Sequence, residues 1–159
     1  MIRLLLPEVQ EMAKITGAET IRGLPVEPDA LPSRVILNQS LRGADGSPRA
    51  YRWSVPYLIV WEAEPRIVGS IGGKGLLEDE DDVELAYNVA LRFRRRGVAT
   101  RAIAEIRKLA AEDRLGLLAH LEPDNVGSRR ALINNDFVLD GVVRLPDSLD
   151  LERWTWSPD

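Results

Sequence analysis

The sequence predicts a mixed α/β fold in which helices pack on a mixed β-sheet. From residue 51 onward the hydrophobic patterns follow the order β-β-β-α-β-α-β-β, which is typical of such a sheet. The chain has 159 residues, of which 45% are hydrophobic and 29% charged. This is enough to bury one continuous core, so we expect residues 1–159 to form a single domain.

The first fifty residues carry the weakest patterns. The apolar residues 4–6 predict an edge strand, and the segment 7–17, which begins with proline, predicts a helix. A second helix is predicted over 29–41, where Pro32 confines the regular part to the residues that follow it. The turn-forming segment GADGSP at 43–48 predicts a loop.

Three strand patterns follow one another after residue 51. Residues 57–63 form an aromatic and β-branched run, and residues 67–71 resume it after a short turn. Glycines interrupt this second strand, which indicates a bulge or the close approach of another backbone. A third strand is predicted at 83–90, after the acidic stretch EDEDD at 78–82. We expect these three strands to be antiparallel neighbours.

The strongest helix pattern lies over 98–110, where apolar residues recur at helical spacing. The stretch LGLLAHLEP at 115–123 shows no alternation, which predicts a strand buried on both faces. A second helix follows, with Asp124 or Asn125 as its N-cap. Two final strands are predicted, over 137–145 and 151–156.

Charge and residue usage exclude several classes of function. With 25 acidic and 21 basic residues, the chain lacks the positive field of a nucleic-acid-binding protein. It has no cysteine, which excludes disulfides and a cysteine nucleophile. The one histidine, His120, has no surrounding ligand set, so we expect no metal site. We interpret it as a core imidazole, with a catalytic imidazole as the alternative. No run approaches the ~20 apolar residues of a membrane span, so we expect a cytoplasmic protein without a membrane partner.

The loop before the strongest helix predicts an anion site. A strand that ends near Val89, followed by a loop containing Gly97 and Ala99, would bring the free amides of the first helical turn to one point. Three consecutive arginines precede that glycine, Arg94, Arg95 and Arg96. Guanidinium groups favour two-pronged contacts with phosphate oxygens, so a pyrophosphate fits better than a carboxylate. The alternatives are a solvated basic surface and a basic patch for nucleic acid, which the net acidity disfavours.

Residues 57–156 resemble the GNAT superfamily of N-acyltransferases. Its acetyl-CoA-binding signature is Arg or Gln, two residues, Gly, one residue, then Gly or Ala, and RRRGVA at 94–99 fits every position. Val89 matches the family's valine at the preceding strand end. Asn125 and Ser128 resemble the second CoA-side motif.

The resemblance implies the GNAT fold, a mostly antiparallel twisted sheet that is splayed at the cofactor site and flanked by helices. Residues 51–159 would form the sheet and the CoA-binding core, and residues 1–50 the acceptor side. The family commonly has a glycine where this chain has Asp136, and aspartate tolerates the left-handed backbone of such a turn.

The resemblance also implies acetyl-CoA as co-substrate and a primary amine as acceptor, either a protein N-terminus or a small molecule. Backbone amides would hold the diphosphate, Asn125 would reach the pantetheine arm, and an amide near Val89 would polarise the thioester carbonyl. The implied contacts to acetyl-CoA are Val89, Arg94, Arg95, Arg96, Gly97, Val98, Ala99, Thr100 and Asn125.

Glu84 matches the family's general base on the strand before the signature, although an exposed structural carboxylate is the alternative. The tyrosine that many members use as general acid is absent, with Ala131 and Leu132 at its place. Ser128 is the best-placed substitute, acting through water. The missing tyrosine leaves open a second function, an acyl-CoA-binding module without turnover. The oligomeric state also stays open, with a homodimer as one alternative.

Two further patterns have structural and functional interpretations. Tyr87 shares strand parity with Leu85 and Val89, which predicts a packing residue. The acidic stretch 78–82 predicts a solvated hairpin tip, and the alternative is a surface that attracts cationic amines.

Overall fold

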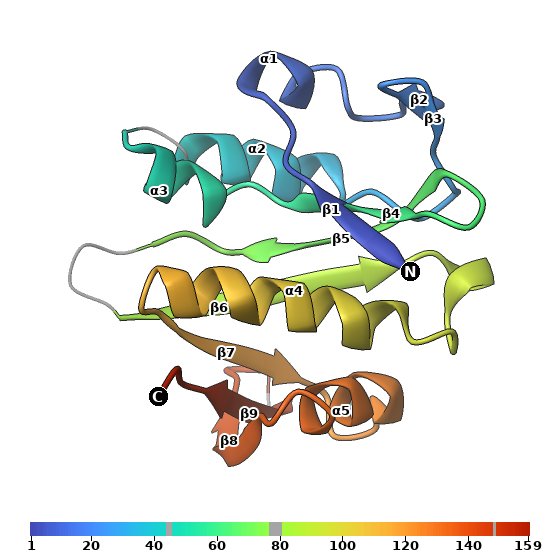
Figure 1. Ribbon diagram of the computed structural model, residues 1–159. Helices are drawn as coiled ribbons and strands as arrows, with labels where there is room; N and C mark the ends of the chain where they lie inside the picture. The colour runs from blue at the N-terminus through green and yellow to red at the C-terminus, as the bar shows by residue number, and fades with distance from the viewer. Residues whose placement is uncertain (44–45, 77–80, 148) are drawn as a thin grey trace.

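The computed structural model of the protein describes residues 1–43, 46–76, 81–147 and 149–159. Within them a seven-stranded sheet has the order β1-β4-β5-β6-β7-β9-β8 (Figure 1). Its strands are β1 (Ile2–Leu5), β4 (Tyr57–Trp61), β5 (Arg66–Gly73), β6 (Asp82–Val89), β7 (Gly116–Leu121), β8 (Val138–Arg144) and β9 (Asp150–Trp156). Every neighbouring pair is antiparallel except β6 and β7, which are parallel. The predicted fold class is therefore confirmed.

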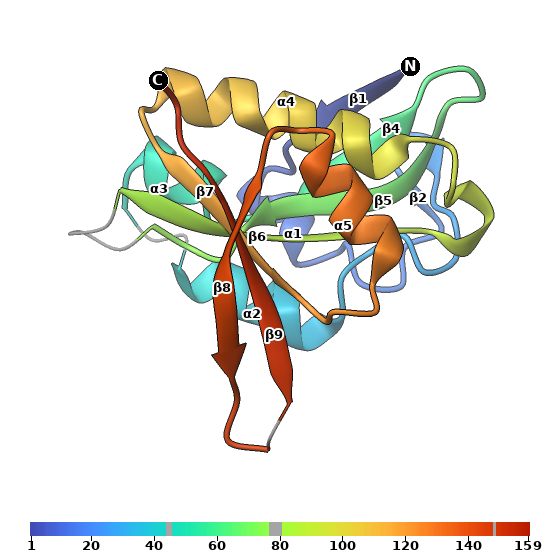
Figure 2. The same ribbon diagram turned by 90° about the horizontal axis from the view of Figure 1, so that it is seen from below.

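Helices cover both faces of the sheet, with α2 and α4 on opposite sides (Figure 2). A two-stranded hairpin of β2 and β3 lies outside the sheet. The helices are α1 (Val9–Met12), α2 (Arg34–Gly43), α3 (Pro48–Arg52), the 3-10 helix η1 (Leu91–Phe93), α4 (Val98–Glu112) and α5 (Val126–Ile133). The small hairpin consists of β2 (Thr20–Ile21) and β3 (Leu24–Pro25).

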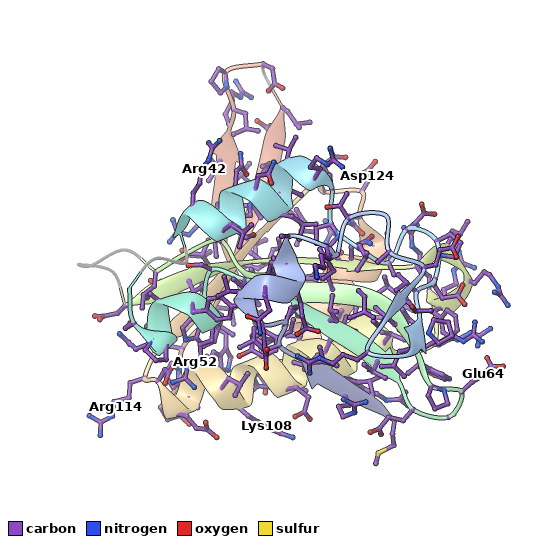
Figure 3. The ribbon with its side chains drawn as sticks, turned by 90° about the horizontal axis from the view of Figure 1, so that it is seen from above. Arg42, Arg52, Glu64, Lys108, Arg114 and Asp124 are labelled. Atoms are coloured by element: carbon purple, nitrogen blue, oxygen red, sulfur yellow. The ribbon has the colours of Figure 1, made fainter. Side chains whose placement is uncertain are left out.

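Two hydrophobic cores lie on the two faces of the sheet. On the α4 side, Leu85 and Val89 of β6 pack with Ile103 and Ile106, which are fully buried. On the α2 side, Leu37 packs in a cluster with residues of β4 and β5. Alternation along β6 directs one set of side chains into the first core and leaves the other set on the α2 face. The outer side of α4 is polar, and Lys108 points away from the sheet there (Figure 3).

The elements before β4 differ most from the sequence prediction. Helix α1 covers only 9–12 instead of 7–17, because the chain turns after Met12 and buries Ile15 in the core on the α2 side. Helix α2 starts at Arg34, after Pro32, as expected.

The predicted loop at 43–48 leads directly into a helix that the sequence analysis missed. In α3, the Ala50 amide donates to the Ser47 hydroxyl at 3.1 Å, and Pro48 occupies the first turn. Residues 44–45 of this predicted loop lie outside the described residues.

The glycines of β5 mark close contacts between backbones, as predicted. A Cβ at Gly69 would lie 2.3 Å from the Asn88 carbonyl oxygen, and the β4–β5 register shifts beside it, between Ile59 and Val60. A Cβ at Gly73 would lie 2.5 Å from the Trp53 carbonyl oxygen. The sheet and the segment before β4 can approach this closely only where side chains are absent.

The C-terminal half largely follows the prediction. Asn125 caps α5, accepting a hydrogen bond from the Ser128 amide at 3.1 Å, and Asp136 adopts the expected left-handed backbone with φ 63°. The prediction that β7 is buried on both faces is wrong, because Leu118 and His120 are only partly buried. They face the α2 side of the sheet, next to the position where β6 diverges from β7.

Candidate active site

Strands β6 and β7 separate in the middle of the sheet. They pair over only three positions, from Asp82 opposite Gly116 to Glu84 opposite Leu118. Beyond these positions β6 pairs with β5, and β7 pairs with β9. In the described part of the chain, residues 85–89 therefore have no strand partner on the β7 side. A free strand edge can hydrogen-bond an extended ligand.

Helix α4 follows β6 after a short loop and begins with free amide groups. Its N-cap, Gly97, has φ 75°, a left-handed conformation that favours glycine. The first backbone hydrogen bond of the helix runs from the Arg101 amide to the Gly97 carbonyl, at 3.1 Å. The described residues supply no partner for the amides of Val98, Ala99 and Thr100. The positive end of the helix dipole and these donors are the features that attract anions to helix N-termini.

The three arginines before Gly97 differ in their contacts. Arg94 Nε donates to the Val89 carbonyl at 2.9 Å, which ties the loop to the end of β6. The Arg96 guanidinium lies over the Phe93 ring, 5.0 Å from its centroid. Arg95 has left-handed backbone with φ 61°, and all three arginines are exposed. The structure therefore places three exposed arginines in the loop that leads into the free amides of α4.

The first turn of α5 lies beside β6. Burial raises the pKa of the Tyr87 phenol, and a hydrogen bond with Ser128 acts in the opposite direction. Tyr87 also packs against the core on the α4 side, as its parity predicts. Ser128 thus lies next to the strand that diverges from β7, while its amide is bound to the Asn125 cap.

Glu84 lies on the opposite face of β6, at the last position that pairs with β7. Its Oε1 accepts hydrogen bonds from Lys74 Nζ at 2.7 Å and from His120 Nδ1 at 3.0 Å. Partial burial raises the pKa of the Glu84 carboxyl, but the bonds from Lys74 and His120 outweigh burial and hold it below its usual value. Glu84 is therefore an ionised and well-anchored carboxylate.

A cavity of about 560 Å³ lies between α2 and the sheet, on the face that carries Glu84. Asn88 reaches across its edge, where its amide donates to the Asp29 carbonyl. The cavity walls include Ile36, Gln39 and Ser40 of α2, together with Ser70, Lys74 and Asn88 at the sheet. Lys74 both lines the cavity and contacts Glu84.

Sequence reasoning missed Lys74 and the contact between His120 and Glu84. The sequence favours a core imidazole for His120 over a catalytic one, but its side chain is 21% exposed and bonded to Glu84. Alternation along β7 indicates that His120 and Leu118 share a face. The pairing of β7 with β6, which brings that face to Glu84, cannot be read from either strand alone. Of the acidic stretch 78–82, residues 78–80 lie outside the described residues.

Comparison with known proteins identifies the family. Residues 8–138 match the family model of the acetyltransferase (GNAT) domain. No curated protein sequence matches the chain significantly. The described residues contain no helix that is long and apolar enough to cross a membrane.

Several solved structures share the fold of this chain at low sequence identity. Ribosomal-protein-S5-alanine acetyltransferase from Vibrio fischeri has a TM-score of 0.72 at 15% identity, covering 99% of this chain and 93% of that one. Microcin C7 self-immunity acetyltransferase MccE, solved with acetyl-CoA and AMP, has a TM-score of 0.68 at 16% identity, covering 98% and 92%. RimL, a ribosomal L7/L12 alpha-N-protein acetyltransferase solved with coenzyme A, has a TM-score of 0.70 at 13% identity, covering 99% and 94%. With the family match over most of its length, the chain belongs to the GNAT family of acetyltransferases.

Proposed function

We propose that the protein transfers an acetyl group from acetyl-CoA to a primary amine, on a protein N-terminus or a small molecule. The observation that carries this proposal is the set of free α4 amides beside the diverging edge of β6. The α4 amides would bind the diphosphate of acetyl-CoA, and the free edge of β6 would bind its pantetheine arm. The fold neighbours MccE and RimL were solved with acetyl-CoA and coenzyme A, respectively, which supports this choice of donor.

The residues around α4 fit the donor chemically. The amides of residues 97–100 and the exposed Arg95 and Arg96 would bind phosphate oxygens, and Arg94 would keep the loop on Val89. The backbone of Val89 would contact pantetheine. Asn125 would reach the same arm from the start of α5, where its side chain also caps the helix.

The cavity under α2 is the proposed acceptor site. Residues 29–40 supply much of its wall, in keeping with the expectation that residues 1–50 shape the acceptor side. An incoming ammonium group would lose a proton to the Glu84–His120 pair, and the free amine would attack the thioester carbonyl. Ser128 remains our proposal for relaying a proton to the leaving thiolate.

Acetyl-CoA binding can be measured as a shift in melting temperature. A ligand present at 100 times its Kd stabilises the folded state by about 2.7 kcal/mol, or roughly 5–11 °C for a chain of this size. The double variant Arg95→Gln and Arg96→Gln should reduce the shift. Lys108→Gln, which removes an exposed cation from helix α4, should leave the shift unchanged. An absent shift in the wild type would refute donor binding.

Turnover distinguishes an enzyme from a binding module. Release of CoA thiol is measured with a panel of amines that includes peptides with free N-termini, and the chain contributes no thiol because it has no cysteine. We expect thiol release with at least one amine. A normal melting shift without release by any amine would favour the acyl-CoA-binding module instead.

Location and assembly stay predictions. The cytoplasmic location is tested by fractionation of cells that express the protein. The homodimer is tested by sedimentation across protein concentration, in which a monomer at all concentrations would contradict it.

A further inference from the structure

The Glu84–His120 hydrogen bond bridges two strands at the point where they separate. Glu84 is the last residue of β6 that pairs with β7, opposite Leu118, and His120 lies two residues further along β7. Side chains two apart share a face, so Leu118 and His120 both lie on the face that carries Glu84. The 3.0 Å contact between His120 Nδ1 and Glu84 Oε1 therefore spans the start of the gap, on the side of the cavity under α2.

The chemistry of the pair fixes which imidazole nitrogen is free. Glu84 is ionised, so its Oε1 can only accept, and it accepts from both Lys74 and His120. Nδ1 of His120 must then carry the hydrogen, which leaves the lone pair of the neutral imidazole on Nε2. Among the described residues, no hydrogen bond occupies Nε2. The free nitrogen can therefore accept a proton.

We propose that His120 Nε2 takes the proton from the acceptor ammonium and that Glu84, held by Lys74, is a positioning residue that orients the imidazole. This inference rests on the function proposed above. In the step, one ammonium proton moves to Nε2, the nitrogen lone pair forms the C–N bond, and the C–S bond of the thioester breaks. The second proton leaves the nitrogen and ends on the departing thiolate. His120 then returns its proton to solvent.

Glu84 is a poor proton acceptor by comparison. Two donors already engage Oε1, and the low pKa of the carboxyl makes it a weak base near neutral pH. Histidine is the side chain that most often acts as a general base near neutral pH. Its 21% exposure gives water a route to the ring.

Four charged groups lie on the strands around His120 or directly after them. Lys74 follows β5, Glu84 lies on β6, and Arg153 on β9 stands directly opposite His120. Arg153 Nε pairs with Asp140 of β8 at 3.4 Å, which offsets the charge of this cation. Two carboxylates and two cations thus set the local field, and pH dependence must be measured with all four present.

The first experiment follows the imidazole itself. His120 is the only histidine, so protein without a histidine tag gives one imidazole signal set in NMR, which needs no assignment. A titration of the wild type gives its midpoint, and the same titration is made on Glu84→Gln. A displaced midpoint and an altered tautomer signature in the variant are expected. Identical titrations in both proteins would overturn the Glu84–His120 coupling.

The second experiment measures acetyl transfer across pH. The kcat/KM of the wild type should fall at low pH with the midpoint that NMR gives for His120. His120→Gln should lose about 100-fold or more of kcat, within the usual contribution of a general base, and lose this inflection. Glu84→Gln should retain part of kcat and show a displaced inflection in the pH profile. Glu84→Asp should have a higher kcat than Glu84→Gln. Glu105→Gln, an exposed α4 variant, is the control.

The outcomes separate this inference from the proposed function. If the wild-type protein shows no turnover with any amine, both the proposed function and this inference are refuted. A wild-type turnover that His120→Gln keeps, with an unchanged pH profile, overturns only the role of His120, and so does a Glu84→Gln variant that is inactive beside an active His120→Gln. His120→Asn is measured in parallel, and the acetyl-CoA melting shift verifies that each variant is folded. Recovery of a His120→Ala variant by free imidazole would support proton acceptance at this position.

Discussion

Replacing Asp113 with alanine should weaken the junction between α3 and the end of α4. The Asp113 carboxylate accepts hydrogen bonds from Trp53 Nε1 at 2.6 Å and from Arg52 Nη2 at 2.9 Å. Figure 3 shows Arg52 between the two helices. Trp53 is only 1% exposed, so water cannot replace the lost acceptor of its indole N–H. The variant would leave a buried donor unpaired.

The magnitude follows from these two contacts. An unpaired buried donor costs about 1–3 kcal/mol, and a partly exposed ion pair contributes at most about 1 kcal/mol. We expect Asp113→Ala to lower the free energy of unfolding by about 3 kcal/mol, which corresponds to a melting temperature roughly 6–12 °C lower. Urea unfolding with an unchanged m-value is the appropriate measurement.

Asp150→Ala provides the matched control. Its carboxylate pairs with the exposed Arg144 at 3.0 Å, so its loss should change stability by less than about 0.5 kcal/mol. If Asp113→Ala unfolds within about 0.5 kcal/mol of the wild type, the indole hydrogen bond does not stabilise the fold as argued.

Three further changes test the backbone and the site. Gly97→Ala places a side chain at φ 75° and should cost about 1–2 kcal/mol in urea unfolding, whereas Gly127→Ala, in helix α5 with open space around it, should not destabilise. Asn125→Ala removes the α5 cap and should cost about 1 kcal/mol, most of which Asn125→Ser should restore. The lowered pKa of Glu84 implies stability that is complete above its unfolded value of about 4.3 and lost as the pH falls through the folded value. Glu84→Gln should therefore lose less stability than the wild type between neutral pH and about pH 3, and equal losses would contradict this.

The order of elements after residue 51 could be predicted because it rests on local patterns. Hydrophobic alternation and helical spacing locate β4 to β9, α4 and α5, and the chemistry of Asn125 and Asp136 predicts a cap and a left-handed turn. The elements before β4 could not be predicted equally well. Helix α1 ends where tertiary packing buries Ile15, and α3 depends on a Ser47 cap that resembles ordinary loop sequence.

The candidate site also has one part that local sequence predicts and one part that depends on how distant strands pair. The amides after Gly97 and the arginines before it are neighbours in sequence, so their convergence could be predicted. The contact between Glu84 and His120 joins residues 36 positions apart. It depends on the register of a short parallel ladder and on the divergence beyond it, and a hydrophobic pattern specifies neither.

The register of the three paired positions of β6 and β7 fixes the number of residues that can connect α4 to β7. Residues 113–115 span this connection, and side chains alternate between faces along β7. Removing one residue there would move the ladder by one step, turn the imidazole toward the interior and place an alanine or leucine beside the Glu84 carboxylate. Natural versions of this chain that keep the Glu84–His120 pair should vary in which residues occupy 113–115 but always have three of them.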